Sequence, residues 1–574
     1  MFLSGKMFLI SGAVAALLVL AAACGGTDTV PTPAAAPAAP AAKPVETDTT
    51  AASTEGQPQY GGTYQTHARG EPRGGFEPQM PGGLREKRML VNGVMENFVA
   101  QPGLPEAPCQ NIMAPWLLKE WGYTDDTTFQ LKIHEGIKFH DLPPVNGREF
   151  TADDLAFSIE RAFSRGLDPG VKEYVKEIKV ADKYTVNVIM TQAIPALEIK
   201  WLTKSWLVGV AKESLDAEGE FGRDSMIGTG PYIMTDYDVG TGAKFVKNPD
   251  WYLANVNGKD KPYIDAIQMR WIAAKPTRLA AFEAGKLDSL DEISPSEHLR
   301  VVKTHPEGIY VPCPSSLFRV WMQTSAPPMD DLRVRRAISM AIDRDNIIKS
   351  IYRGRGGVAG FAFPDTPGAT PYNELSAEAK ANLTYNPQKA RELLAEAGFA
   401  DGFKLQVTTP TQFGSPWNEV AEALIPMFKD IGLDAFMDPI GKGEYNETVQ
   451  IGVYPHIALA KSTGGWDRLD GSLSLHVSDN NPASNRGNLN DAKFDALMDT
   501  AMTTLDEATM WKAAYEAENY FLTEALSFVW VPGPLYHWAY QPWVKDADGS
   551  MDGSSQSHRG GHMLMVSELW FEGK

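Results

Sequence analysis

Apolar and polar residues alternate along much of the chain, in places with the period of a strand and in places with that of a helix. The segment FQLKIHEGIKF, residues 129–139, alternates with a break at Gly136 and predicts a half-buried strand. In TADDLAFSIERAFSRG, Thr151 as N-cap and Asp154 form a capping box, and apolar residues recur at helical spacing until Gly166. This part of the chain therefore predicts a strand, a turn and a helix.

Further segments extend this mixture of strands and helices. IKVADKYTVNVIM predicts a hairpin. MDDLRVRRAISMAID predicts an amphipathic helix, and YNPQKARELLAEAGF predicts another, with Asn386 as N-cap, Pro387 in the first turn and Gly398 as the stop. The apolar face of the first of these helices would carry Val334, Ile338, Ala341 and Ile342. No fixed repeat runs through the chain, so the predicted class is α/β or α+β.

The N-terminus has the pattern of a secretory signal peptide over residues 1–23. Lys6 precedes an apolar run that closes on small residues; a membrane-spanning anchor is the alternative interpretation. Cys24 directly after this site resembles the acylated cysteine of bacterial lipoproteins, although Leu20 lies one place further from it than usual. Residues 24–59 are rich in Thr, Pro and Ala and predict a disordered tether. The folded part is therefore expected outside the cytoplasm, anchored to a membrane by a lipid.

Composition limits the classes of function that remain. The 574 residues carry a formal net charge of −19, which argues against a nucleic-acid partner. About 500 residues follow the tether, more than one core usually organises, so two or three lobes are expected. Apart from Cys24 the chain has Cys109 and Cys313, which form either one disulfide or two free thiols.

Seven segments carry a resemblance to a known family. They are YGGTY, NGREFTADDLAFSIERAF, GTGPYIM with KNPDWY after it, FEAGKLD, DDLRVRRAISMAID, YNPQKARELLAEAGF and KFDALMDTA, spread from residue 60 to beyond residue 500. In this order they resemble the solute-binding proteins of ABC transporters, family 5, which includes oligopeptide- and dipeptide-binding proteins. The resemblance covers nearly all of the folded chain.

The resemblance implies an α/β, two-lobed periplasmic-binding-protein-like fold of class II, the large type, with a hinge between the lobes. Lobe one would comprise residues 60–313 with an inserted subdomain at about 100–225, lobe two residues 314–529, and residues 530–574 would return to lobe one. The implied protein is a monomer without cofactor or metal. It would bind a ligand between its lobes and deliver it to ABC permease subunits and their ATPase.

Candidate ligand-binding residues lie in the predicted second lobe. The resemblance assigns to Asp467, or failing that to Asp470, the capture of a ligand's amino group; both are otherwise solvated loop residues. Trp466 would stack on a ligand or pack in the core. Arg319 and Trp321 share one face of a strand-like segment, and Arg319 would pair with a ligand carboxylate or with an internal acid.

Enzymatic interpretations find little support in the sequence. His134 and Glu135 are followed by His140, which is not zinc-protease spacing, and two glycines separate His558 from His562. The predicted function is therefore binding without chemistry, with an oligopeptide as the first choice of ligand. The alternatives are an oligosaccharide or another solute for the same kind of importer and, from other classes, an extracellular ligand sensor or hydrolase.

Overall fold

In the computed structural model of the chain, every described element belongs to one unit, Thr50–Lys574. The structure describes residues 57–71, 76–79, 93–100, 113–195, 197–216, 221, 226–254, 261–314, 317–357, 361–362, 368–411, 414–462, 469–478, 484–546 and 566–574. The predicted signal peptide, Cys24, nearly all of the tether and Cys109 lie outside these residues.

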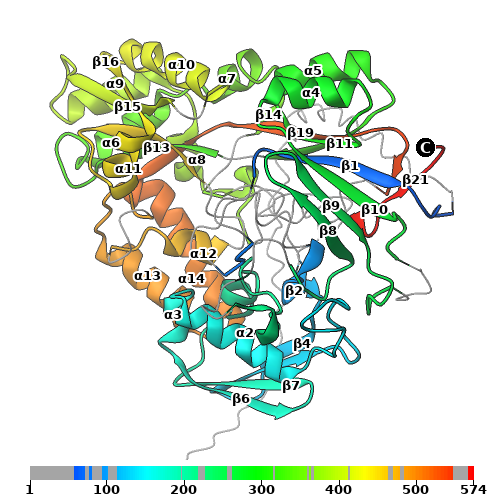
Figure 1. Cartoon of the computed structure of the whole chain (residues 1–574). Helices are drawn as coiled ribbons and strands as arrows, with labels where there is room; N and C mark the ends of the chain where they lie inside the picture. The colour runs from blue at the N-terminus through cyan, green and yellow to red at the C-terminus, as the bar shows by residue number, and fades with distance from the viewer. Residues whose placement is uncertain are drawn as a thin grey trace, which may run out of the picture. The chain divides into compact units, whose positions relative to one another are not determined.

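Two sheets share a core in the first lobe (Figure 1). The first has the order β1-β10-β9-β8, with β1 parallel to β10; the second has the order β11-β19-β12. Their facing apolar side chains include Tyr64, Phe245 and Trp538. The elements are β1 (Thr63–Ala68), β8 (Tyr232–Asp238), β9 (Gly242–Lys247), β10 (Ala266–Trp271), α4 (Lys275–Glu283), β11 (Ser289–Ile293), α5 (Pro295–Thr304), β12 (Ile309–Pro314), β19 (Gly533–Tyr540), β20 (Val544–Lys545) and β21 (Trp570–Phe571).

A separate antiparallel sheet, of order β4-β5-β7-β6, has its own core with α2. The predicted hairpin forms β6 and β7, and the predicted capping box is confirmed because the Thr151 amide donates to Asp154 Oδ2 at 3.0 Å. The elements are β2 (Val99–Ala100), β3 (Ala114–Pro115), β4 (Leu118–Tyr123), β5 (Thr128–Ile133), α2 (Ala152–Ser164), α3 (Pro169–Lys172), β6 (Val175–Asp182), β7 (Thr185–Met190), η1 (Glu198–Leu202) and η2 (Lys212–Ser214).

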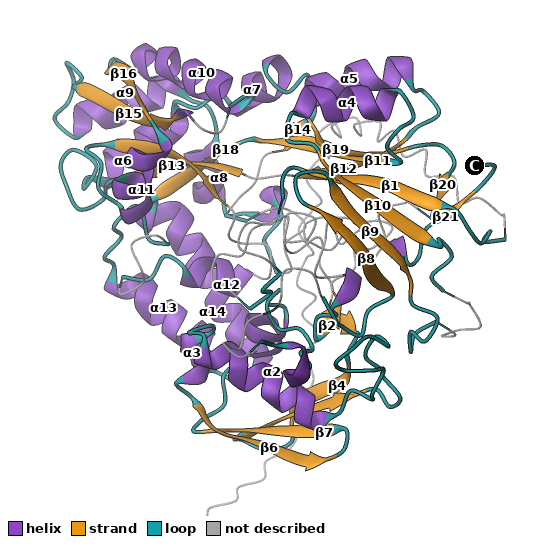
Figure 2. Ribbon diagram, viewed as in Figure 1, coloured by secondary structure: helices purple, strands orange, loops and turns teal. Residues whose placement is uncertain are grey.

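A five-stranded sheet of order β16-β15-β17-β13-β18, with helices on both faces, forms the second lobe (Figure 2). Its strands are β13 (Leu317–Met322), β15 (Lys404–Pro410), β16 (Asp434–Ile440), β17 (Ile457–Ser462) and β18 (Phe528–Val531). Its helices are α6 (Leu332–Met340), α7 (Arg344–Ser350), η4 (Tyr372–Glu374), α8 (Ala377–Leu383), α9 (Pro387–Glu396), α10 (Trp417–Asp430), α11 (Lys442–Glu447), η6 (Val449–Ile451), α12 (Leu469–Ser474), α13 (Ala492–Thr503), α14 (Glu507–Tyr520) and η7 (Phe521–Ala525).

The two predicted helices of this lobe form where expected. Asn386 caps α9, with its Oδ1 accepting from the Lys389 amide at 3.0 Å, and Gly398 follows with φ +92°. The other helix, α6, ends at Met340, earlier than the pattern predicts. Ala341 and Ile342 nevertheless lie in the core, because the turn after α6 keeps them against it.

Among the described elements, two links between the sheets of the two lobes lie side by side. One passage leads from β12 to β13 and the other from β18 to β19. Pro314 is paired with Leu535 on one side of the passages, and Phe318 with Val531 on the other. β14 (Gly356–Gly357) adds a further contact, since it pairs with Gly533 and Pro534 at the start of β19.

The backbone of residues 93–95 lies so close to Gly228 and Gly230 of GTGPYIM that only glycine fits at these two positions. A Cβ on Gly228 would lie 2.0 Å from the Val94 carbonyl oxygen, and one on Gly230 would lie 2.6 Å from that of Gly93. The Gly230 amide donates to Val94 O at 2.9 Å, and the His140 amide donates to Gly228 O at 2.8 Å. The segment is therefore held between two backbone stretches that leave no room for a side chain.

We expect Gly228→Ala to lower the free energy of unfolding by about 1–3 kcal/mol, because the new methyl group must displace the backbone at Val94. Urea denaturation measures this. Gly443→Ala in α11 is the matched control, since no atom lies within 4 Å of its Cβ position. Equal unfolding midpoints for the two variants would contradict the packing explanation.

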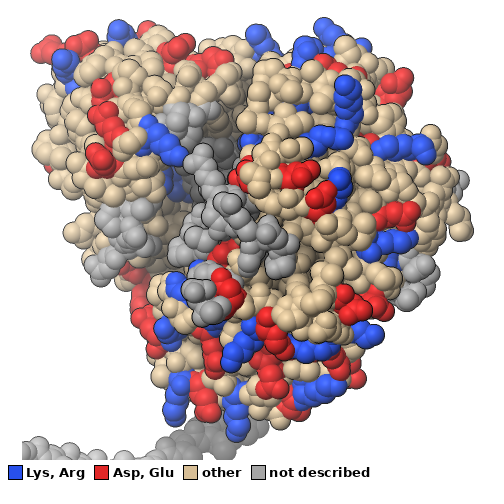
Figure 3. All heavy atoms as spheres, in the orientation of Figure 1, with Lys and Arg blue, Asp and Glu red and all other residues tan. Residues whose placement is uncertain are grey.

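Charged side chains of both signs are interspersed on the face of the molecule shown in Figure 3. Among the residues drawn in colour there, blue and red alternate without a continuous basic area. None of the helices in the described ranges is both long and apolar enough to cross a bilayer.

Candidate functional site

Arg319 and Trp321 lie on one face of β13, as the alternation in the sequence predicts. Successive side chains of a strand point to opposite faces. Phe318, Val320 and Met322 point into the core formed with α6, α9 and α10. Arg319 and Trp321 point the other way and are only 3% and 1% exposed. A guanidinium group is thereby placed inside the second lobe.

Aromatic rings surround this guanidinium. Its central carbon lies 4.2 Å from the ring centroids of both Phe528 and Trp530 on β18, and 5.3 Å from that of Trp321. Each ring face attracts the positive charge. Arg319 Nη1 is 3.3 Å from Nε2 of His476, which lies in the turn after α12. Arg319, Trp321, His476, Phe528 and Trp530 are called the Arg319 cluster below.

The Arg319 cluster has more hydrogen-bond donors than acceptors. Arginine only donates, so His476 Nε2 accepts from it and the imidazole proton lies on Nδ1. His476 Nδ1, Arg319 Nε and Trp321 Nε1 are all buried and have no hydrogen-bond partner in the described structure. Three N–H groups are thus left without an acceptor, each at a cost in free energy.

The electrostatic environment of the cluster favours an anion. Burial, and then the positive charge of Arg486, lower the pKa of Arg319 well below its ordinary value. The pKa of His476 is also lowered, first by burial and then by the positive charge of Arg319. Within the described ranges, no carboxylate makes an ion pair with Arg319. An acceptor of negative charge would stabilise this arrangement.

The structure contradicts one of the two interpretations of Asp470 that the sequence allowed. It is 2% exposed, in the first turn of α12, so the expectation of a solvated loop residue is wrong for it. The local sequence could not predict this burial, because it does not reveal that α12 packs against a face of the sheet.

The structure places the other candidate residues as follows: Trp466 and Asp467 lie outside the described residues. Cys313 is on β12, where its backbone pairs with Tyr536.

Several members of the cluster escaped sequence analysis. His476, Phe528 and Trp530 come from segments more than 150 residues after β13. The alternation in FVWV of β18 places Phe528 and Trp530 on one face of that strand, and that is the signal that could have found them. That β18 pairs with β13, however, cannot be predicted from the residues of β18 alone.

Two of the histidines singled out in the sequence, His134 and His140, lie in the described residues. His140 is buried, and its Nε2 is 3.0 Å from the Gly230 carbonyl oxygen, while His134 lies beside the Tyr252 ring. The described part of the chain contains no group of three His, Cys, Asp or Glu side chains arranged to hold a metal ion. His558 and His562 lie outside that part.

Comparison with solved structures shows a shared fold. The periplasmic binding protein DppA from Helicobacter pylori, solved in complex with the peptide STSA, superposes with a TM-score of 0.66 and 20% identity, over 90% of this chain and 99% of its own. The ABC transporter substrate-binding protein CtaP from Listeria monocytogenes gives 0.73 and 20%, over 89% and 100%. The predicted α/β, two-lobed periplasmic-binding-protein fold is confirmed.

Two relatives from sequence comparison have different named ligands. Heme-binding protein A of Haemophilus influenzae is 25% identical over 452 residues, covering 73% of this chain and 78% of its own. Di/tripeptide-binding protein 1 of Pseudomonas aeruginosa is 25% identical over 459 residues, covering 75% and 82%.

Residues 113–484, well over half of the chain, match the family described as bacterial extracellular solute-binding proteins, family 5 Middle. The matched range contains the Arg319–Trp321 segment, α6 and α9. The resemblance inferred from the seven sequence segments is thereby confirmed. The chain belongs to the bacterial extracellular solute-binding proteins of family 5.

Proposed function

We propose that this protein captures a carboxylate-bearing solute, with an oligopeptide as the first choice, and delivers it to an ABC importer without chemical change. The Arg319 cluster is the observation that carries this proposal. Its buried guanidinium, with Nε unpartnered, fits a ligand carboxylate, which accepts hydrogen bonds and supplies a negative charge. The aromatic rings would pack against the apolar part of the ligand.

Closure of the lobes is the proposed means of capture. The proposed division, with lobe one at 60–313, lobe two at 314–529 and a return at 530–574, is supported by the paired passages between the sheets. Two adjacent strand passages form a narrow connection that can bend while each sheet keeps its core. Contacts made by the ligand to both lobes would then favour the closed state.

The proposed location is the outer face of a membrane. The signal-peptide pattern of residues 1–23 and the small residues before Cys24 support a lipid anchor at that cysteine. The Pro-, Ala- and Thr-rich residues up to 59 would act as a tether that lets the binding lobes reach a permease. Delivery to permease subunits and their ATPase follows from membership of the family.

A thermal-shift screen of the protein against di- to pentapeptides, oligosaccharides and heme tests the ligand class. A solute at about 100- to 1,000-fold excess over its Kd is expected to stabilise the protein by about 3–4 kcal/mol. If Asp467 captures the amino group of a peptide, Asp467→Asn should weaken the response to free peptides but not to N-acetylated ones.

The outcomes of the screen distinguish the proposed ligand classes. A response to oligosaccharides alone would contradict the carboxylate proposal and favour the sugar alternative. A response to heme alone would leave a carboxylate-bearing ligand but exclude the peptide. A response to none of these solutes would contradict the capture of a peptide, an oligosaccharide or heme.

A further inference from the structure

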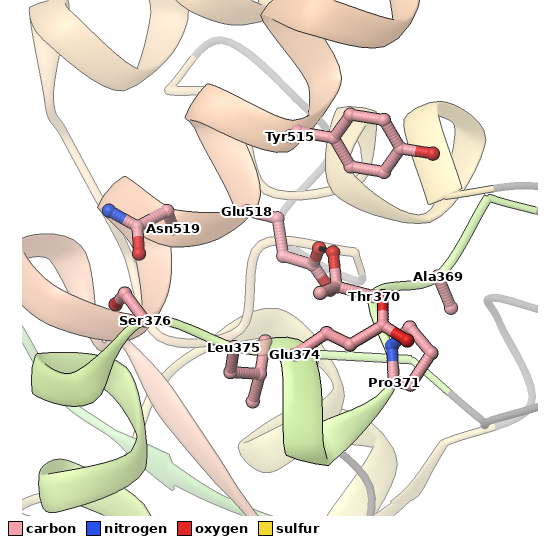
Figure 4. A pocket seen from close by; sticks show the side chains of 9 residues that line it. All are labelled: Ala369, Thr370, Pro371, Glu374, Leu375, Ser376, Tyr515, Glu518 and Asn519. Atoms are coloured by element: carbon pink, nitrogen blue, oxygen red, sulfur yellow. Dashed lines mark hydrogen bonds between the residues drawn. The ribbon is translucent and has the colours of Figure 1, made fainter. Parts of the chain in front are cut away.

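A pocket of about 480 Å³ lies in the second lobe, between the segment that leads into α8 and one side of α14 (Figure 4). Its volume is in the range of small-molecule sites. The polar residues that line it are Thr370, Glu374, Ser376, Tyr515, Glu518 and Asn519. No residue of the Arg319 cluster contributes to this lining.

Glu518 is the buried charge of this pocket. Its side chain is 2% exposed and, as Figure 4 shows, projects from α14 toward Thr370. Thr370 Oγ1 donates to Oε2 of Glu518, whereas Oε1 is buried without a hydrogen-bond partner in the described structure. Burial raises the pKa of Glu518 to about 7, against the opposing effect of Thr370. The carboxyl group is thus held near its point of ionisation, with one oxygen unused.

The lining of the pocket is rich in acceptors and carries no positive charge. Glu374 adds a second carboxylate, and the lining residues include no lysine or arginine. The Tyr515 ring is 44% exposed and stacks on Trp511 with centroids 5.8 Å apart. A carboxylate deep in the pocket and an aromatic ring at its edge are complementary to an organic cation. A metal ion is disfavoured, because no metal-ligating group of three side chains occurs within the described ranges.

We propose that this pocket is an accessory binding site for a small primary ammonium compound. The ammonium group donates to Oε1 of Glu518, which the protein leaves unpartnered, and the alkyl chain lies along the Tyr515 ring. An ion pair of this kind favours the ionised form of Glu518. Binding therefore expels the proton from any molecule in which Glu518 is still protonated. This site is independent of the proposed solute-capture function.

Titration calorimetry of the whole protein with n-butylammonium chloride tests the proposal. The matched pair of variants is Glu518→Gln and Glu516→Gln, because both replace a glutamate of α14 by glutamine, but Glu516 is exposed. We expect saturable binding at one site for the wild type and Glu516→Gln, and affinity about tenfold weaker or worse for Glu518→Gln. Proton release, measured in two buffers of different ionisation enthalpy, should vanish above the pKa of Glu518 and in Glu518→Gln.

The proposal is overturned if Glu518→Gln binds n-butylammonium as well as the wild type does, if 1-butanol binds equally well, or if no saturable binding occurs at millimolar concentrations. Tyr515→Leu serves if Glu518→Gln does not fold, since Tyr515 lies at the surface of α14. Several-fold weaker binding with proton release retained would support the site, and unchanged affinity would contradict the role of the ring. Peptide capture, measured on the same variants, should not change.

Discussion

Replacing Arg319 with methionine is expected to abolish the capture of a carboxylate-bearing peptide while the protein remains folded. Truncating one partner of a desolvated charge pair costs about 2–5 kcal/mol of binding free energy. Methionine fills the space between Phe528 and Trp530 but cannot donate to a carboxylate. Calorimetry with a peptide that responds in the screen, and with its C-terminal amide, measures the loss. Amidation of the peptide should weaken binding to the wild type and add little further loss in Arg319→Met.

Arg333→Met is the control for this experiment, because Arg333 lies on α6 of the same lobe, is exposed and pairs with Asp331. It should bind the peptide as the wild type does. The free energy of unfolding of Arg319→Met should be unchanged or higher, since the substitution removes a buried charge that no acid accompanies. Peptide binding at wild-type affinity by Arg319→Met would show that the guanidinium is only a core residue.

Arg161→Met is expected to cause a large loss of stability, about 3–5 kcal/mol, because it removes the closest ion-pair partner of the buried Glu77 carboxylate, which Arg165 approaches only to 4.0 Å. Arg161 on α2 makes two hydrogen bonds to Glu77, Nη1 to Oε1 at 2.9 Å and Nη2 to Oε2 at 2.5 Å, and both side chains are buried. Gln79 contacts both members of this pair, since its Oε1 accepts from Arg161 at 2.7 Å and its backbone amide donates to Glu77 Oε1 at 2.8 Å. Urea denaturation measures the change.

Two further variants test the cause of this loss. Lys132→Met removes one partner of the exposed Lys132–Glu120 pair in the neighbouring sheet, and its unfolding midpoint should match that of the wild type. Adding Glu77→Gln to Arg161→Met should restore part of the stability, because no unpaired charge then remains. An Arg161→Met variant as stable as Lys132→Met would contradict the importance of the buried pair.

The local elements could be predicted because their signals lie within a few residues. The capping box of Thr151 and Asp154, the Asn386 cap and the positive φ of Gly398 each involve neighbours in sequence. The end of α6 could not be placed, since Ala341 and Ile342 stay buried after the helix stops. The apolar pattern of the helix extends past its end, because these two residues are buried although the backbone is no longer helical there.

Only part of the candidate site could be predicted from the sequence, because its residues come from segments that are far apart in the chain. Alternation along β13 placed Arg319 and Trp321 on one face, because that depends on the strand period alone. The neighbours of Arg319 depend on the strand order β17-β13-β18 and on α12, which brings His476 to the guanidinium. The same packing buries Asp470. Contacts between distant segments depend on tertiary structure, which no local pattern contains.

Small-angle X-ray scattering of the protein, first without ligand and then saturated with a peptide that responds in the screen, tests most directly whether the two lobes close on a solute. The proposed mechanism predicts a smaller radius of gyration in the presence of the peptide, and no such decrease with its C-terminal amide at the same concentration. An unchanged radius of gyration at saturation would contradict capture by closure.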